Sequence, residues 1–205
     1  LVGGDQRALV TEMAGRASVE MKSKELGYDI TGDAERVTHI VETVKDLESK
    51  GWTFEAADAS FELILMGSDE SQSRFEVESW RTIVEQDASG DVRTEATVKV
   101  RANGERMIST AEGNGPVNAL DKALRSAVTS LHPELEPLEL IDYKVRILEK
   151  SDADTSGTAS VTRVLVSTSD GKREWTTLGV HENVVAASWR ALEDALTYGL
   201  MRSQA

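Results

Sequence analysis

The residues whose types and spacing come nearest to a binding motif are Gly113-Asn114-Gly115-Pro116. They stand between a strand-like run, residues 105–111, and a helical pattern. Two glycines permit positive φ angles, and proline suits the first turn of a helix, where an N–H group is needed least. Because the first N–H groups of a helix have no partner within it, this connection could hold a carboxylate or phosphate. A motif of this kind is a weak signal and favours the alternative that it is simply the turn that the connection requires, although both interpretations stay open.

The other reactive side chains do not form a catalytic pattern. His39, His132 and His181 are scattered without metal-binding spacing, so no metal site is predicted. We expect His39 and His132 at the surface, whereas His181 lies at a second strand-to-helix connection and could touch a ligand there. No GxSxG motif is present, and the acidic residues near 69 and 152 lie in loop-like segments. The sequence therefore predicts no catalytic centre.

Composition limits the possible partners. The 205 residues carry a formal charge of −13, which argues against binding nucleic acid and disfavours an anionic membrane surface. No apolar run is long enough to span a bilayer, and there is no secretory signal. The absence of cysteine fits a reducing compartment, so a cytoplasmic location is expected. The chain starts at Leu1, which indicates a piece of a longer protein.

The first third of the chain has helical periodicity. Apolar residues keep helical spacing within residues 5–26 and again in a helix that Asp33 can cap and Gly51 can end. A third short helix is expected after Thr53. Short turns join these segments, which predicts a small helical linker subdomain over residues 1–66.

The remaining residues, 73–205, predict two successive βββα units, 73–131 and 138–205. In the first, the alternation shifts between Ser79 and Trp80, which suits a bulged strand, and Asn103-Gly104 suits a two-residue hairpin. In the second, the first strand is marked by Ile141, Tyr143, Val145 and Ile147, and we expect a matching turn at Ser169-Asp170-Gly171.

An internal duplication supports this division, because residues 118–124 align with residues 186–192 in the two predicted helices. Each helix has an apolar stripe that would cover one face of its sheet. The predicted fold class is α+β: a helical linker followed by a tandem βββα repeat.

Four sequence blocks resemble a known family. GNGPVNALDKALR (113–125) and GVHENVVAASWRALEDAL (179–196), with GDQRALVTEMAGRASVEMKSKELG (4–27) and KDLESKGWTFEAADASFELIL (45–65), resemble the C-terminal half of the 2-isopropylmalate synthase family. The 45–65 block is more similar to its citramalate synthase branch.

The resemblance implies a role within a larger enzyme. Such proteins have an N-terminal barrel that condenses acetyl-CoA with a 2-oxo acid on a divalent metal, a reaction of the acyltransferase class. A linker and a tandem βββα domain follow, and the latter dimerises and binds the end-product amino acid. This chain lacks the barrel's HxH motif, so by resemblance it is inactive alone, needs no cofactor of its own, and leaves acetyl-CoA and the metal to the barrel.

The resemblance also gives the first connection a ligand, a branched-chain amino acid, with isoleucine expected rather than leucine. Its carboxylate would lie at the loop of Gly113, Gly115 and Asn118, where family members often have Asp instead of Asn118. Its ammonium group would meet Glu182 or backbone carbonyls, beside His181. The residues expected around its side chain are Leu138, Ile141, Val145 and Val161.

Other functions stay open. One is the leucine-binding regulatory domain of a 2-isopropylmalate synthase. Another is a dimerisation module that has no effector pocket. An independent enzyme is disfavoured, because no nucleophile, base and orienting group can be placed together.

Overall fold

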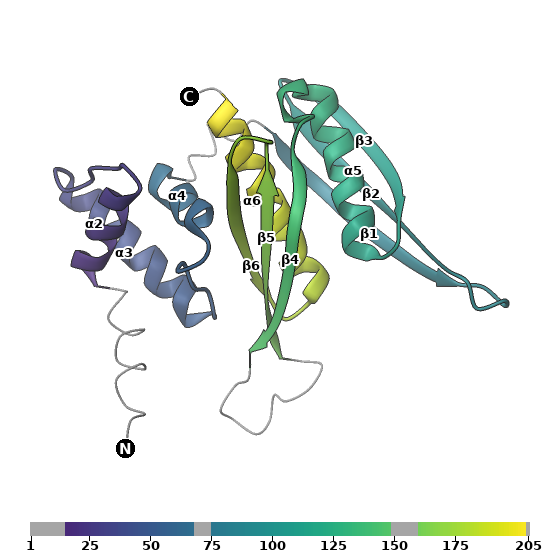
Figure 1. Cartoon of the computed structure of the whole chain (residues 1–205), viewed down its shortest axis with the longest axis horizontal. Coiled ribbons are helices and arrows are strands. Elements are labelled where there is room, and N and C mark those ends of the chain that lie inside the picture. Colours follow the sequence, from purple (N-terminus) through teal and green to yellow (C-terminus); the bar gives the residue numbers. More distant parts are fainter. Residues whose placement is uncertain (1–14, 68–74, 149–159, 204–205) are drawn as a thin grey trace, which may run out of the picture.

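The computed structural model describes residues 15–67, 75–148 and 160–203. Three helices come first, α2 (Arg16–Glu25), α3 (Ala34–Ser49) and α4 (Asp58–Met66). The first βββα unit comprises β1 (Glu76–Gln86), β2 (Val92–Ala102), β3 (Glu105–Gly113) and α5 (Pro116–Leu131). A short 3₁₀ helix, η2 (Pro133–Leu135), leads to β4 (Glu139–Leu148), β5 (Val161–Ser169), β6 (Glu174–His181) and α6 (Val184–Ser203). The α+β fold with two βββα units is as predicted (Figure 1).

The helical part has its own small core. Asp33 caps α3 as predicted, because its carboxylate accepts a hydrogen bond from the Arg36 N–H at 2.9 Å. The third helix begins only at Asp58, later than the expected start after Thr53. In the first helix the described part begins at Arg16, and residues 5–14 of the predicted span lie outside the described residues. The buried side chains of this core are Val19, Ile30, Val37, Ile40, Val44, Phe54, Phe61 and Leu65.

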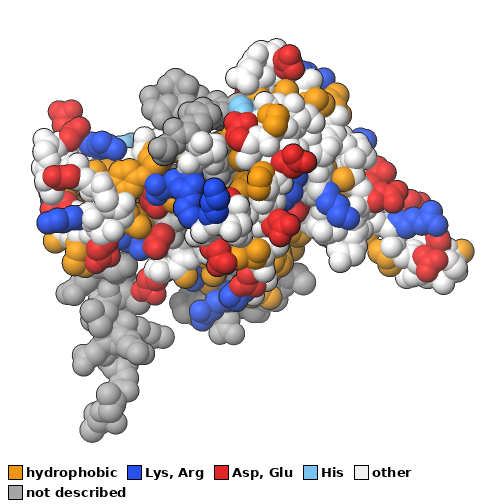
Figure 2. All heavy atoms as spheres, turned by 45° about the horizontal axis from the view of Figure 1, so that its top comes forward, with side chains coloured by type: hydrophobic (Ala, Val, Ile, Leu, Met, Phe, Trp, Pro, Cys, Tyr) orange, Lys and Arg blue, Asp and Glu red, His pale blue; other side chains and the backbone are white. Residues whose placement is uncertain are grey.

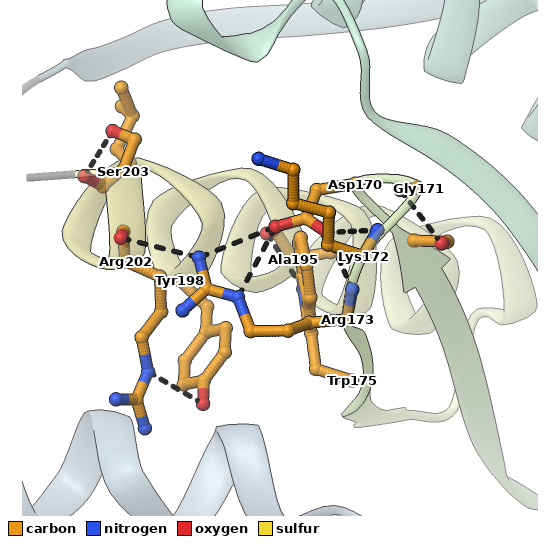
Figure 3. Close-up of polar contacts among 11 residues, drawn as sticks. Asp170, Gly171, Lys172, Arg173, Trp175, Ala195, Tyr198, Arg202 and Ser203 are labelled. Carbon is orange, nitrogen blue, oxygen red and sulfur yellow. Dashed lines mark hydrogen bonds and ion pairs between the residues drawn. The ribbon is translucent and has the colours of Figure 1, made fainter.

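Each sheet is an antiparallel meander, in the orders β1-β2-β3 and β4-β5-β6. The bulge predicted in the first strand lies between Val77 and Ser79. Asn103 and Gly104 have φ angles of 54° and 80°, as the expected two-residue hairpin requires. The β5–β6 connection is longer than predicted, and the Asp170 carboxylate closes it by accepting hydrogen bonds from the backbone N–H groups of Lys172 and Arg173 (Figure 3).

The predicted apolar stripes of α5 and α6 cover one face of each sheet, which we call the inner face. Leu120 and Leu124 of α5 pack against the inner face of β2, and Leu192 and Leu196 of α6 belong to the same cluster. Trp80 of β1 stacks on Trp189 of α6, with ring centroids 5.5 Å apart. An aromatic pair of this kind adds about 0.5–1.5 kcal/mol beyond its buried area. The two βββα units therefore share one core.

The helical part lies against the second sheet, on the side away from the first (Figure 1). The Arg163 guanidinium on the outer face donates to the Gly51 carbonyl, with Nε at 2.8 Å. At the edge of the sheet, the Leu178 N–H of β6 donates to the Ser60 hydroxyl of α4 at 2.8 Å. Helix α4 thus satisfies part of an edge strand that would otherwise present unpaired backbone groups.

A buried carboxylate joins α4 to the end of α6. Glu62 is 4% exposed and accepts hydrogen bonds from Tyr28 at 3.0 Å and Tyr198 at 2.9 Å. Arg202 forms an ion pair with the same carboxylate and donates from Nε to the Tyr198 hydroxyl at 3.0 Å (Figure 3). Burial, together with the hydrogen bond to Glu62, raises the pKa of Tyr28 to about 12, so its hydroxyl stays a donor.

Candidate functional site

The first strand-to-helix connection is open at the start of α5. A Cβ atom at Gly113 would lie 2.5 Å from the Ala119 backbone nitrogen, so only glycine lets the strand end approach the helix this closely. Gly115 precedes α5 with φ 178°, an extended conformation, and a Cβ there would meet nothing within 4 Å. The Asn118 side-chain oxygen accepts from the Asn114 N–H at 3.3 Å, outside the helix. The N-cap residue of α5 is Gly115, which has no side chain to cap the helix, so among the described residues its first turn keeps N–H groups without a side-chain cap.

The second connection has the same shape but is closed by a side chain. The Asn183 side-chain oxygen accepts from the N–H groups of Val185 at 2.8 Å and Ala186 at 3.1 Å. His181 is exposed, and its Nδ1 accepts from the Asn183 N–H at 2.8 Å. Glu182 beside it is also exposed. Asn183 therefore occupies these backbone N–H groups at the start of α6, so fewer N–H groups remain for an anion there than at the start of α5.

Sequence reasoning missed the role of Asn183, although the signal was present. Asparagine is among the preferred residues immediately before a helix. It also expected His132 at the surface. That expectation is wrong, because His132 is 7% exposed, between α5 and η2.

The four apolar residues expected around an effector do not come together within one chain. Leu138 is buried against Gly199, about 22 Å along α6 from its start at 1.5 Å per residue. Ile141 is the extra residue of a bulge between Leu140 and Asp142 and is exposed. It therefore has no partner in the β4–β5 ladder, whereas Tyr143 and Val145 do. Val161 pairs with Leu148 on the outer face, near Gly51, whereas Val145 pairs with Val164 on the inner face.

Each sheet leaves an apolar patch uncovered on its inner face, at the end of the sheet where its helix begins. We call these two patches together the open inner face; they comprise Val84 and Val92 on the first sheet and Val145 and Ile147 on the second, all between 46% and 63% exposed. The β1–β2 hairpin that carries the first two extends beyond α5 and forms the projection on the right of Figure 2.

The open inner face is aligned with the two connections. Val84 pairs with Thr94, which pairs with Gly113 at the first connection. Ile147 pairs with Thr162, which pairs with His181 at the second. Since neighbouring strands lie about 4.8 Å apart, each apolar residue is about 10 Å from its connection. The two units thus repeat one arrangement, an apolar residue two strands away from a helix start.

Comparison with known proteins identifies the family. Residues 55–200 match the family model described as the LeuA allosteric (dimerisation) domain. The chain belongs to this family. Along 99% of its length it is 60% identical to an (R)-citramalate synthase of Streptomyces coelicolor, and it is 39% identical to one of Aquifex aeolicus. A 2-isopropylmalate synthase of Acetivibrio thermocellus is 27% identical over 96% of the chain.

These findings confirm the resemblance to the 2-isopropylmalate synthase family and to its citramalate synthase branch. The chain spans 38% of the length of the first two relatives. The LeuA domain match begins in the α3–α4 connection and covers both βββα units, so the connections and the open inner face all lie within it. Among the described residues, no helix is long and apolar enough to cross a membrane, and no acidic and histidine side chains cluster as metal ligands would.

Proposed function

We propose that this chain is the regulatory and dimerising part of a citramalate synthase-like acyltransferase, and that it binds isoleucine as a feedback inhibitor. The observation that carries the proposal is the match of residues 55–200 to an allosteric, dimerising domain. The 60% identity to an (R)-citramalate synthase supports the choice of branch. The remainder of such an enzyme would hold the divalent metal and acetyl-CoA, and this chain alone is expected not to catalyse the condensation.

The first connection is the better place for the amino acid's carboxylate. The start of α5 has no side-chain cap, and Gly115 leaves space beside the backbone for a ligand to approach. The partial positive charge of a helix start favours an anion. Asn118 is neutral, so its side-chain oxygen can accept a hydrogen bond from the ammonium group but adds no negative charge.

The apolar side chain of the ligand would lie on the open inner face, and a second copy of the chain would complete the pocket. A single chain leaves Val84 and Ile147 more than half exposed and does not gather Leu138, Ile141, Val145 and Val161. Apolar residues exposed together typically mark an interaction surface. Dimerisation and effector binding would then depend on the same residues, which gives the ligand a means to alter the arrangement of the two chains.

Calorimetry of the chain with isoleucine, leucine and valine tests this function. We expect isoleucine to bind most tightly and, at about 100 times its dissociation constant, to stabilise the fold by about 2.7 kcal/mol. Asn118→Ala should weaken binding about tenfold, because it removes one hydrogen-bond acceptor of the ligand. The matched variant Asn183→Ala, at the closed connection, should leave the affinity unchanged. Absence of heat with all three amino acids would reject effector binding, and preference for leucine would instead support a 2-isopropylmalate synthase.

A dimerisation module without an effector is the second candidate, favoured by the closed start of α6. Sedimentation separates the two roles. Ile147→Asp should dissociate the dimer, because it places a charge on the open inner face. Ile108→Asp should not, because Ile108 is also exposed but lies on the outer face of the first sheet. A dimer that ignores every branched-chain amino acid would leave only the structural role.

A further inference from the structure

A cavity lies over the outer face of the second sheet, and Val145 of the open inner face also borders it. It has a volume of about 1010 Å³ and separates the end of α3 and the α3–α4 connection from the outer face of β4 and β5. Its lining is part aromatic and part charged. The lining includes Trp52 and Phe54 on the helical side, and Lys144, Arg146, Arg163 and Leu165 on the sheet.

Two arginines lie side by side on the sheet surface that lines this cavity. Arg146 and Arg163 are directly opposite in the β4–β5 ladder, on the outer face. Like charges at such positions destabilise a sheet, and their Cβ atoms are about 5 Å apart. Burial and then the charge of Arg146 lower the pKa of Arg163. Within residues 15–67, 75–148 and 160–203, neither guanidinium takes part in an ion pair with a carboxylate.

The remaining charges around the cavity do not cancel this pair. Lys45 and Lys144 add two cations, and Lys144 already pairs with Asp142 at 2.5 Å. The lining carboxylates among the described residues are Glu48 and Glu55, and the charge of Glu55 acts on Arg163. The balance of these described lining residues is positive, in a chain whose overall formal charge is −13. An excess of cations in a concave site of an acidic protein favours an anionic ligand, because low-dielectric walls concentrate the field.

The geometry of the arginines indicates which kind of anion. Arg163 is held in place by its bond to the Gly51 carbonyl, so its remaining N–H groups are preorganised. Guanidinium groups bind phosphate in a two-pronged manner, and two of them side by side match a diphosphate. Trp52 stacks with Phe54, with centroids 6.1 Å apart, and forms an apolar wall. The volume is at the upper end for small-molecule sites, which suits a ligand of nucleotide size.

We propose that this groove binds a phosphorylated small molecule, with its phosphates between Arg146 and Arg163 and its flat or apolar part against Trp52. The site differs from the amino acid site proposed above, because its arginines lie on the opposite face of the second sheet from Ile147, although Val145 borders both. Binding here would bridge the helical part and the βββα units.

The test is calorimetry of the 205-residue chain with pyrophosphate and with ADP at low ionic strength. Both should bind, and ADP should bind more tightly. Arg146→Gln should weaken both about tenfold or more, because it removes a charge-assisted contact. Trp52→Leu should weaken ADP alone and leave pyrophosphate unchanged. Arg81→Gln is the matched control, since Arg81 is also exposed but lies on the outer face of the first sheet.

Three results would overturn the proposal. The first is absence of heat with either ligand at millimolar concentration. The second is an equal loss of affinity in Arg81→Gln and Arg146→Gln, which would mean attraction by general charge. The third is citrate binding as tightly as pyrophosphate, which would show no preference for phosphate. Isoleucine binding is measured separately, so failure here would leave the proposed effector role intact.

Discussion

Removing the Glu62 carboxylate should loosen the attachment of the helical part to the βββα units. Glu62→Ala leaves two tyrosine hydroxyls and the Arg202 guanidinium without their shared acceptor. Breaking a buried ion pair costs about 3–5 kcal/mol. The Arg202 side chain is 31% exposed and can be rehydrated, which places the expected loss of unfolding free energy near the lower limit, about 3 kcal/mol.

Urea unfolding of three variants measures this loss. Asp58→Ala is the matched control, because Asp58 lies on the same helix and pairs with Lys22 at 2.7 Å but is 59% exposed. Exposed pairs contribute about 1 kcal/mol or less. Glu62→Gln keeps the shape and an acceptor oxygen but removes the charge, so its cost should fall between the other two. A Glu62→Ala cost no larger than that of Asp58→Ala would refute the view that this carboxylate joins α4 to α6.

Further expectations concern α6. Burial raises the pKa of Asp194 to about 7, above an unfolded value of about 3.9. Because the folded state binds this proton more tightly than the unfolded state, the free energy of unfolding should fall as pH rises from about 4 to 7. Melts across this range should show a flatter profile in Asp194→Asn; an unchanged profile would contradict the assignment. Asn183→Ala should cost about 1 kcal/mol in thermal unfolding, since it removes the helix cap, and no loss would argue against capping. Gly179→Ala should cost about 3 kcal/mol of unfolding free energy in urea, because its Cβ would lie 1.9 Å from the Ala187 carbonyl oxygen. Gly115→Ala should cost about 1 kcal/mol or less, because its Cβ would meet nothing within 4 Å and only the preference for glycine before a helix is lost; similar costs for the two variants would contradict this packing.

Local patterns predicted most of the elements. Helical spacing identified the stripe of α5, where Leu120 and Leu124 are buried, and residue pairs such as Asn103-Gly104 identified a turn. These signals succeed because a helix period or a two-residue turn depends on neighbours in the sequence. The β1 bulge also left a trace, since the alternation changes where the extra residue lies.

The candidate site could be predicted only in part, because its members lie on different elements. Alternation grouped Ile141 with Val145 in one strand, but it did not indicate that a bulge in β4 leaves Ile141 without a ladder partner. It also could not distinguish Val164, which α6 covers, from Val145, which the helix does not reach. The Gly113 connection was found from its residue types, whereas the pairing of Arg146 with Arg163 depends on a strand register that the sequence does not display.

The contact between Ser60 and the Leu178 N–H has a practical consequence for anyone shortening the chain. A version that starts at β1 would keep both sheets and both covering helices, yet it would expose the β6 edge and the fully buried Leu178. Bare strand edges pair readily with other molecules. The shortest fragment that stays monomeric at this edge is therefore expected to begin before α4. A fragment that contains only the two βββα units should self-associate through β6.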